Sequence, residues 1–115
     1  MSVKNISGKE FCEIMQADPD SLEIIDIREQ HEYEIIRIKN SKLIPMSVLE
    51  FRLEEIDWNK KVVLCCRTGG RTRMMCSRLD GKKEVYNLKG GILALYTQRC
   101  NCLEVDESMV GRYFN

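Results

Sequence analysis

The stretch that decides the fold is Val62-Val63-Leu64-Cys65-Cys66-Arg67-Thr68-Gly69-Gly70-Arg71-Thr72. Its apolar start predicts a short strand that is buried on both faces, as strands of parallel sheets are. A loop with two glycines and two arginines follows, and the apolar spacing from Thr72 to Leu79 predicts a helix. A strand, a tight loop and a helix in succession aim backbone N–H groups at one point. The stretch therefore predicts a site for an anion or a thiolate.

The cysteine at the start of the loop is the candidate nucleophile of this site. Two glycines allow loop conformations that other residues resist, and the N-terminus of the following helix adds partial positive charge. No acidic residue occurs between Lys61 and Arg78. We therefore expect the thiolate form of this cysteine to be stabilised and reactive. The alternative is a buried structural cysteine beside a basic surface turn.

Length and composition are those of an ordinary folded protein. The chain has 115 residues, of which 43% are apolar and 31% charged, and we expect residues 1–115 to form a single domain. It contains neither an apolar N-terminal run nor a stretch of about 20 apolar residues, so neither a signal peptide nor a membrane helix is predicted. The expected location is the cytoplasm, with no membrane partner.

The six cysteines do not have the spacing of a disulfide framework, and we expect them to be thiols in a reducing compartment. One Cys-x-Cys pair and one histidine are too few ligands for a zinc site, so no metal is expected. The Cys100-Asn101-Cys102 pair has two interpretations. It could resolve or relay sulfur carried by the loop cysteine, but two ordinary thiols are the simpler interpretation.

Charge is unevenly distributed along a chain whose formal net charge is zero. Residues 61–99 hold 9 basic and 2 acidic residues, a net charge of +7, and they include the loop. Residues 1–60 hold 8 basic and 13 acidic residues, a net charge of −5. The concentration of positive charge favours a small anionic ligand. Nucleic acid is not an expected partner, because no basic patch rich in aromatic residues accompanies the charge.

Strand and helix patterns alternate along the chain. The expected strands are 22–27, 43–44, 61–65 and 84–88. The expected helices are one between Ser7 and Asp18, one or two turns over 29–36, and helices over 47–56, 72–80 and 92–98, while the last fifteen residues show no assignable pattern. This alternation predicts an α/β fold with three layers, in which a mainly parallel central sheet is flanked by helices.

Two other segments are expected at the same edge of the sheet as the loop, because ligands bind beyond the carboxyl ends of parallel strands. One is Asp26-Ile27-Arg28, which closes the second strand pattern, and the other is Lys89-Gly90-Gly91. Asp26 and Arg28 could contact the loop or pair with each other as scaffolding at the strand end. Scaffolding is the interpretation that we favour.

Three blocks of the sequence, in order, resemble the rhodanese family of single-domain sulfurtransferases. The first is Ile25-Asp26-Ile27-Arg28-Glu29, followed by Glu32-Tyr33 and Ile44-Pro45. The second block, Cys66 to Thr72, is similar to the active-site loop of that family, Cys-x-x-Gly-x-Arg. The third is Val85-Tyr86-Asn87-Leu88-Lys89-Gly90-Gly91-Ile92, which is similar to the family's Leu-x-Gly-Gly.

The resemblance implies a sulfurtransferase in which Cys66 is the catalytic residue and carries sulfane sulfur as a persulfide. Thiosulfate, a persulfide or a polysulfide would donate the sulfur, and a thiol, including a protein thiol, or cyanide would accept it. This chemistry needs no metal or organic cofactor. The residues implied to bind the substrate or persulfide are Arg67, Thr68, Gly69, Gly70 and Arg71, with Asp26 and Arg28 in support.

Two alternatives stay open at this point. Counted from Cys65, the loop to Arg71 has the Cys-x5-Arg spacing of cysteine-dependent phosphatases and related arsenate reductases. Such a loop would fit a tetrahedral phosphate or arsenate, although Leu64 occupies the position where those phosphatases have histidine. The other alternative is a non-catalytic rhodanese-like module that binds a partner.

Overall fold

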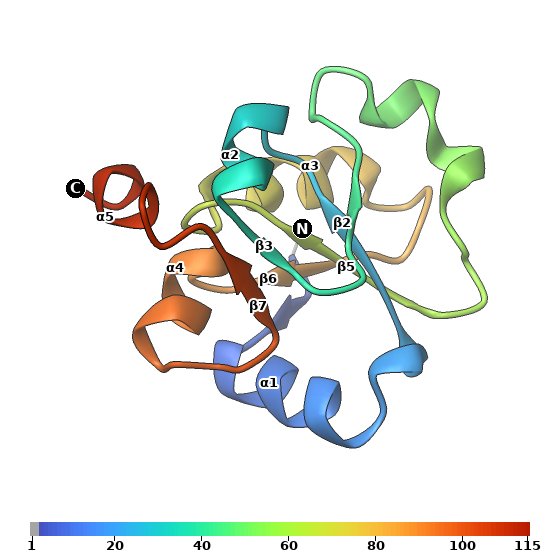
Figure 1. The fold of residues 1–115 in the computed structure, drawn as a ribbon. Coiled ribbons are helices and arrows are strands. Elements are labelled where there is room, and N and C mark those ends of the chain that lie inside the picture. Colours follow the sequence, from blue (N-terminus) through green and yellow to red (C-terminus); the bar gives the residue numbers. More distant parts are fainter. Residues whose placement is uncertain (1–2) are drawn as a thin grey trace.

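The computed structural model describes residues 3–115, and it confirms a mainly parallel sheet flanked by helices (Figure 1). The central sheet has five strands in the order β1-β6-β5-β2-β4, and every pair in it is parallel. These strands are β1 (Asn5–Ile6), β2 (Leu22–Asp26), β4 (Lys42–Leu43), β5 (Lys61–Cys65) and β6 (Tyr86–Leu88). The carboxyl ends of β2, β5 and β6 therefore lie at one edge, as expected.

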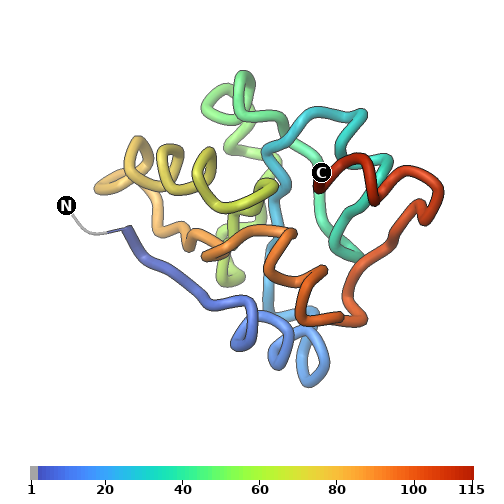
Figure 2. The backbone as a smooth tube through the Cα atoms, turned by 90° about the vertical axis from the view of Figure 1, so that its left-hand side faces the viewer, coloured from blue at the N-terminus to red at the C-terminus, as the bar shows by residue number. Residues whose placement is uncertain are grey.

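Between residues 3 and 97 the structure has four α-helices, and Figure 2 shows the chain turned by 90° from the first view. They are α1 (Gly8–Ala17), α2 (Gln30–Ile35), α3 (Gly70–Leu79) and α4 (Gly91–Thr97). Apolar residues of α1 and α4 form one core with one face of the sheet, and those of α3 form a second core on the other face. No helix in the described part of the chain could span a membrane.

The two cores separate the adjacent cysteines at the end of β5. Side chains alternate between the faces of a strand, so Val63 and Cys65 enter the core with α1 and α4. Leu64 and Cys66 enter the core with α3. The side chains of Cys65 and Cys66 therefore lie on opposite faces of the sheet and cannot enter a site from the same side.

The segment before β5 differs from the prediction. A helix over 47–56 was expected, and the structure has two short 3₁₀ turns instead, η2 (Leu49–Phe51) and η3 (Leu53–Glu55). The N-cap of η2 is Val48, which provides no side-chain cap, and the Glu50 carboxylate pairs with Arg78 at 2.7 Å. Arg52, at φ −128° and ψ 25°, interrupts helical geometry between the two turns. The other expected elements are confirmed, with ends displaced by one or two residues, whereas strands β1 and β3 (Ile36–Ile38) were not predicted.

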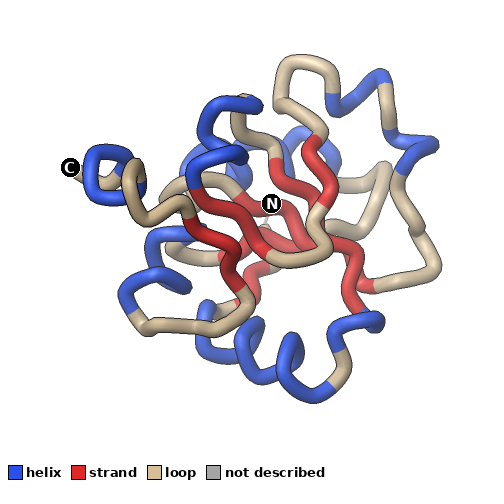
Figure 3. Tube along the Cα trace, in the orientation of Figure 1, coloured by secondary structure: helices blue, strands red, loops and turns tan. Residues whose placement is uncertain are grey.

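The last fifteen residues, which showed no pattern, form two further elements. Strand β7 (Leu103–Val105) pairs antiparallel with β3 (Ile36–Ile38), and a short helix α5 (Val110–Tyr113) follows (Figure 3). The N–H group of Asp106 donates to the carbonyl of Ile35 at 2.7 Å, which ties this segment to the end of α2. The C-terminal segment is thereby brought beside α2.

The prediction that all cysteines are thiols is wrong for two of them. Cys12 of α1 and Cys100, which follows α4, form a disulfide across 88 positions of sequence. The two helices pack against each other on one face of the sheet, which brings these distant residues together. Cys65, Cys66, Cys76 and Cys102 are free, and the sulfur of Cys102 lies 3.0 Å from that of Cys100.

Reduction of this disulfide is expected to lower the free energy of unfolding by about 3–5 kcal/mol, because a cross-link that closes so long a loop restricts the unfolded chain. Urea unfolding followed by circular dichroism, with and without a phosphine reductant, measures the difference. A variant with both Cys12→Ser and Cys100→Ser is the control and should be insensitive to reductant. Identical unfolding midpoints for the oxidised and reduced protein would contradict the expectation.

Candidate active site

The loop after β5 encloses the sulfur of Cys66. Gly69 adopts a left-handed conformation at φ 97°, which favours glycine, and α3 begins at the next residue. The turn brings the N–H group of Gly69 to 3.2 Å from Cys66 Sγ, where it donates to the sulfur. The hydroxyl oxygen of Thr72, in the first turn of α3, lies 3.6 Å from the same sulfur. The Gly69 N–H group and the helix N-terminus favour negative charge on the sulfur.

The N-terminus of α4 contacts the loop through backbone hydrogen bonds. The N–H groups of Ile92 and Leu93 donate to the carbonyls of Cys66 and Arg67 at 2.9 and 3.0 Å. Gly91, at φ 63°, makes this close approach possible, because a Cβ atom there would meet the carbonyl oxygen of Arg67 at 2.5 Å. The Lys89-Gly90-Gly91 segment therefore lies at the same edge as the loop, as expected.

Arg71 is oriented by an acidic residue that the sequence analysis did not include among the site residues. Its two terminal nitrogens each lie 3.0 Å from an oxygen of the Glu32 carboxylate, which α2 presents. Burial would raise the pKa of Glu32, but hydrogen bonds from Arg71, Tyr113 and the backbone of Glu29 outweigh it and lower the pKa to about 2. Glu32 is therefore ionised at neutral pH. Glu32 is far from the loop in sequence, so no local sequence pattern indicated that it pairs with Arg71.

Asp26 and Arg28 form a fully buried ion pair at the end of β2. Arg28 Nε lies 3.0 Å from Asp26 Oδ1, and Arg28 Nη2 lies 2.8 Å from Oδ2. Burial would lower the pKa of Arg28, but the contacts with Asp26 and Tyr113 raise it instead. The guanidinium also donates to the carbonyl of Ile36 and to the hydroxyl of Tyr113, the latter at 3.0 Å. The pair thus connects β2 to the segment that follows α2 and to the C-terminal helix.

Arg67 is half-buried beneath the C-terminal helix and is not free at the rim of the loop. Its Nη2 donates to the carbonyl of Tyr113 at 3.0 Å. Its guanidinium carbon lies 5.4 Å from the ring centre of Tyr113 and 5.7 Å from that of Phe114. Sequence reasoning missed both aromatic residues, because they belong to the segment without a recognisable pattern.

Cys65 has a different environment from Cys66. Its side chain is fully buried, and burial together with the nearby Asp26 carboxylate holds the pKa of its thiol well above the ordinary value. Cys66 is also nearly enclosed, at 1% exposure, but it lies at the loop with the Gly69 N–H group directed at its sulfur. The geometry therefore favours Cys66 over Cys65 as the nucleophile.

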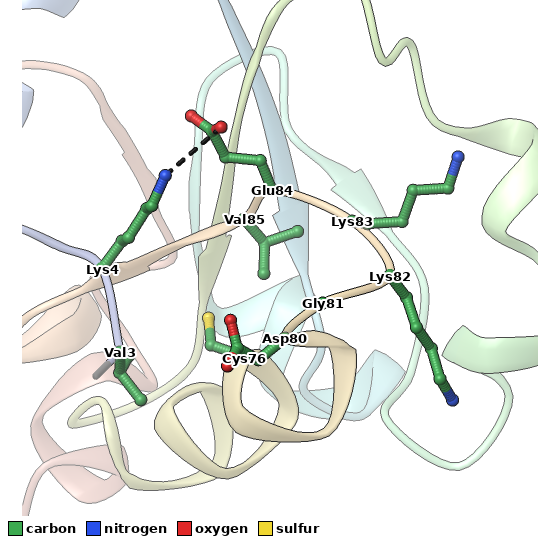
Figure 4. A pocket seen from close by; sticks show the side chains of 9 residues that line it. All are labelled: Val3, Lys4, Cys76, Asp80, Gly81, Lys82, Lys83, Glu84 and Val85. Atoms are coloured by element: carbon green, nitrogen blue, oxygen red, sulfur yellow. Dashed lines mark ion pairs between the residues drawn. The ribbon is translucent and has the colours of Figure 1, made fainter. Parts of the chain in front are cut away.

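A basic hollow flanks the loop on the side of the α3 N-terminus. Thr68, Gly69 and Gly70 contribute to its lining, and Arg73 and Lys89 supply positive charge. Another hollow lies between the N-terminal segment and the connection from α3 to β6, where Lys4 and Glu84 pair at 3.3 Å (Figure 4). No residue of the Cys66–Arg71 loop lines that second hollow. Within residues 3–115, no group of three or more His, Cys, Asp or Glu side chains could hold a metal ion.

Comparison with known proteins agrees with the fold. The profile of the rhodanese-like domain family matches residues 8–98, and the chain therefore belongs to this family. It is 35% identical over 80 residues to a sulfurtransferase of Allochromatium vinosum, covering 68% of this chain and 75% of that protein. It is also 35% identical over 96 residues to the putative sulfurtransferase YtwF of Bacillus subtilis, covering 82% of this chain and 91% of the relative.

Solved structures show the same fold at lower sequence identity. A rhodanese-related protein from Thermoplasma volcanium superposes with a TM-score of 0.74 at 20% identity, covering 90% of this chain and 99% of the other. A rhodanese-like domain protein from Staphylococcus aureus gives a TM-score of 0.73 at 24% identity with the same coverage. The protein is thus a rhodanese-like domain with relatives named as sulfurtransferases.

Proposed function

We propose that the protein acts as a single-domain sulfurtransferase that moves sulfane sulfur through a persulfide on Cys66. The observation that carries the proposal is the N–H group of Gly69 at 3.2 Å from Cys66 Sγ, within a loop at the carboxyl end of β5. A thiolate or a persulfide anion is the species that such a donor stabilises.

The reaction has two displacement steps. In the first, the Cys66 thiolate attacks the outer sulfur of thiosulfate or a persulfide, and the S–S bond of the donor breaks as sulfite or a thiolate leaves with the electron pair. In the second, a thiolate or cyanide attacks the outer sulfur of the Cys66 persulfide. The new bond forms as the persulfide bond breaks, and the Cys66 thiolate is regenerated. Neither step requires a metal or an organic cofactor.

Positive charge around the loop supports an anionic donor. Arg73 and Lys89 line the basic hollow beside the loop, where they would attract thiosulfate. Arg71 and Arg67 contribute further charge from fixed positions, and Asp26 and Arg28 support them as scaffolding. The acceptor is a small-molecule thiol or a protein thiol. We propose the cytoplasm as the location of the reaction, which requires the Cys12–Cys100 disulfide to persist where other thiols are kept reduced.

Intact-mass measurement after mixing with thiosulfate or a polysulfide tests the proposal. One added sulfur atom, about 32 Da, is expected on the peptide that contains Cys66, and cyanide should remove it. The same preparation should hydrolyse an aryl phosphate negligibly. Efficient aryl phosphate hydrolysis that is lost in Cys65→Ser, with no sulfur adduct, would establish the phosphatase alternative. A folded protein with neither activity would indicate a non-catalytic module.

A further inference from the structure

We propose that Tyr113 of the C-terminal helix is a positioning residue of the Cys66 site. Its hydroxyl orients Glu32 and, through Glu32, Arg71, while its backbone carbonyl holds Arg67. The inference rests on the proposed function, because its expected effect on KM requires that the loop binds an anionic substrate. It deepens that function by making Tyr113 part of the site.

The hydroxyl of Tyr113 is the neutral link between two buried charges. It accepts a hydrogen bond from Arg28 Nη1 at 3.0 Å and donates to Glu32 Oε2 at 2.7 Å. Arg28 is fully buried, and Glu32 is 8% exposed. A hydroxyl that accepts from a cation and donates to an anion is polarised by both, so each of its hydrogen bonds strengthens the other. The two bonds restrict the orientation of the Glu32 carboxylate.

The Glu32 carboxylate also binds the guanidinium of Arg71, which lies at the end of the loop. Both of its oxygens lie 3.0 Å from guanidinium nitrogens of Arg71, the geometry in which two parallel hydrogen bonds fix the plane of the guanidinium. The Tyr113 hydroxyl shares Oε2 with Arg71 Nη2. A change in the carboxylate orientation would therefore be transmitted to the arginine beside the Cys66 site.

A second connection runs from the same turn of chain to the start of the loop. The carbonyl of Tyr113 accepts from Arg67 Nη2 at 3.0 Å, and the rings of Tyr113 and Phe114 lie against the Arg67 guanidinium. Figure 1 shows α5 (red) at the same side of the molecule as α2 (cyan). Both loop arginines are thus held from one short helix, which lies beyond residues 8–98 that match the family profile.

Tyr113→Phe is the informative change because it removes only the hydroxyl. The ring and the backbone carbonyl that contact Arg67 remain, so the variant isolates the connection through Glu32. We expect the KM for thiosulfate to rise about threefold to tenfold, the effect of losing one hydrogen bond. The kcat should change less, since Cys66 and the Gly69 N–H group are untouched. The pH midpoint for alkylation of Cys66 by iodoacetamide should rise, because Arg71 at the end of the loop is held less firmly.

Tyr86→Phe provides a matched control, because it removes a hydroxyl with similar contacts at a position away from the loop. The Tyr86 hydroxyl also donates to a carboxylate, that of Glu84 at 3.1 Å, and a cation also lies over its ring, here Lys61 with Nζ at 4.3 Å. It lies at the amino end of β6, away from the loop. This variant should match the wild type in KM, kcat and the alkylation profile.

Combination with Glu32→Gln tests the route of the effect. If Tyr113 acts through Glu32, the KM effect of Tyr113→Phe should largely disappear in a Glu32→Gln background. Equal KM values and equal alkylation profiles for Tyr113→Phe and the wild type would overturn the inference, as would equal shifts in Tyr86→Phe. The alkylation profile separates the two proposals. If the wild-type protein transfers no sulfur, the proposed function fails, and a midpoint shift confined to Tyr113→Phe still supports the positioning of the loop.

Discussion

Cys66→Ser is expected to abolish sulfur transfer, with a loss of about a thousandfold or more, because a hydroxyl cannot replace a thiolate as the acceptor of sulfane sulfur. Cys65→Ser should retain much of the activity. The two residues are adjacent in sequence, but strand alternation directs them into opposite cores, and only Cys66 receives the Gly69 N–H group. Thiosulfate:cyanide sulfur transfer by the two purified variants measures the difference.

The Cys65 variant requires a control for folding. Its thiol is fully buried, and a hydroxyl placed there without a partner is expected to cost about 1–3 kcal/mol of stability. Activity should therefore be measured well below the thermal midpoint and expressed per folded molecule, as judged by circular dichroism. If Cys66→Ser keeps activity while folded Cys65→Ser loses it, the loop starts one residue earlier than we propose.

Gly91→Ala is expected to destabilise the protein by about 2–5 kcal/mol and to prevent sulfur loading of Cys66. A Cβ atom at position 91 would lie 2.5 Å from the carbonyl oxygen of Arg67 and 2.6 Å from that of Cys66. Both are backbone atoms, so the clash cannot be relieved by a side-chain rotation. The positive φ of 63° adds strain for any residue with a side chain. The loop and the N-terminus of α4 would have to separate.

Gly111→Ala is the appropriate comparison for this change. Position 111 lies within α5, and a Cβ atom there would meet nothing within 4 Å. Alanine favours a helical backbone over glycine, so this variant should be as stable as the wild type or more stable. Urea unfolding gives both stabilities, and intact mass after thiosulfate gives the loading. Wild-type loading by Gly91→Ala would show that the contact with α4 does not shape the loop.

Short-range patterns in the sequence were enough to predict four strands of the central sheet, the helix after the loop and a cysteine at the start of the loop. The strand at β5 and the buried face of α3, with Thr72, Met75, Cys76 and Leu79, follow from local periodicity. The N-cap at Ser7, which accepts from the Glu10 N–H group at 3.0 Å, also depends on neighbours in sequence. Such features need no knowledge of distant residues, because the interacting groups lie within one or two turns of chain.

Features that join distant segments were decided only by the tertiary structure. The disulfide of Cys12 with Cys100 and the contacts of Tyr113 with Glu32 and Arg67 depend on how helices pack across the sheet. The pairing of Arg71 with Glu32 likewise requires α2 to lie beside the loop. No local pattern encodes these contacts. Each residue of a pair fits its own helix or turn equally well whether or not its distant partner is present. Sequence alone therefore predicted that a cysteine begins the loop, and the packing decided how the arginines around it are held.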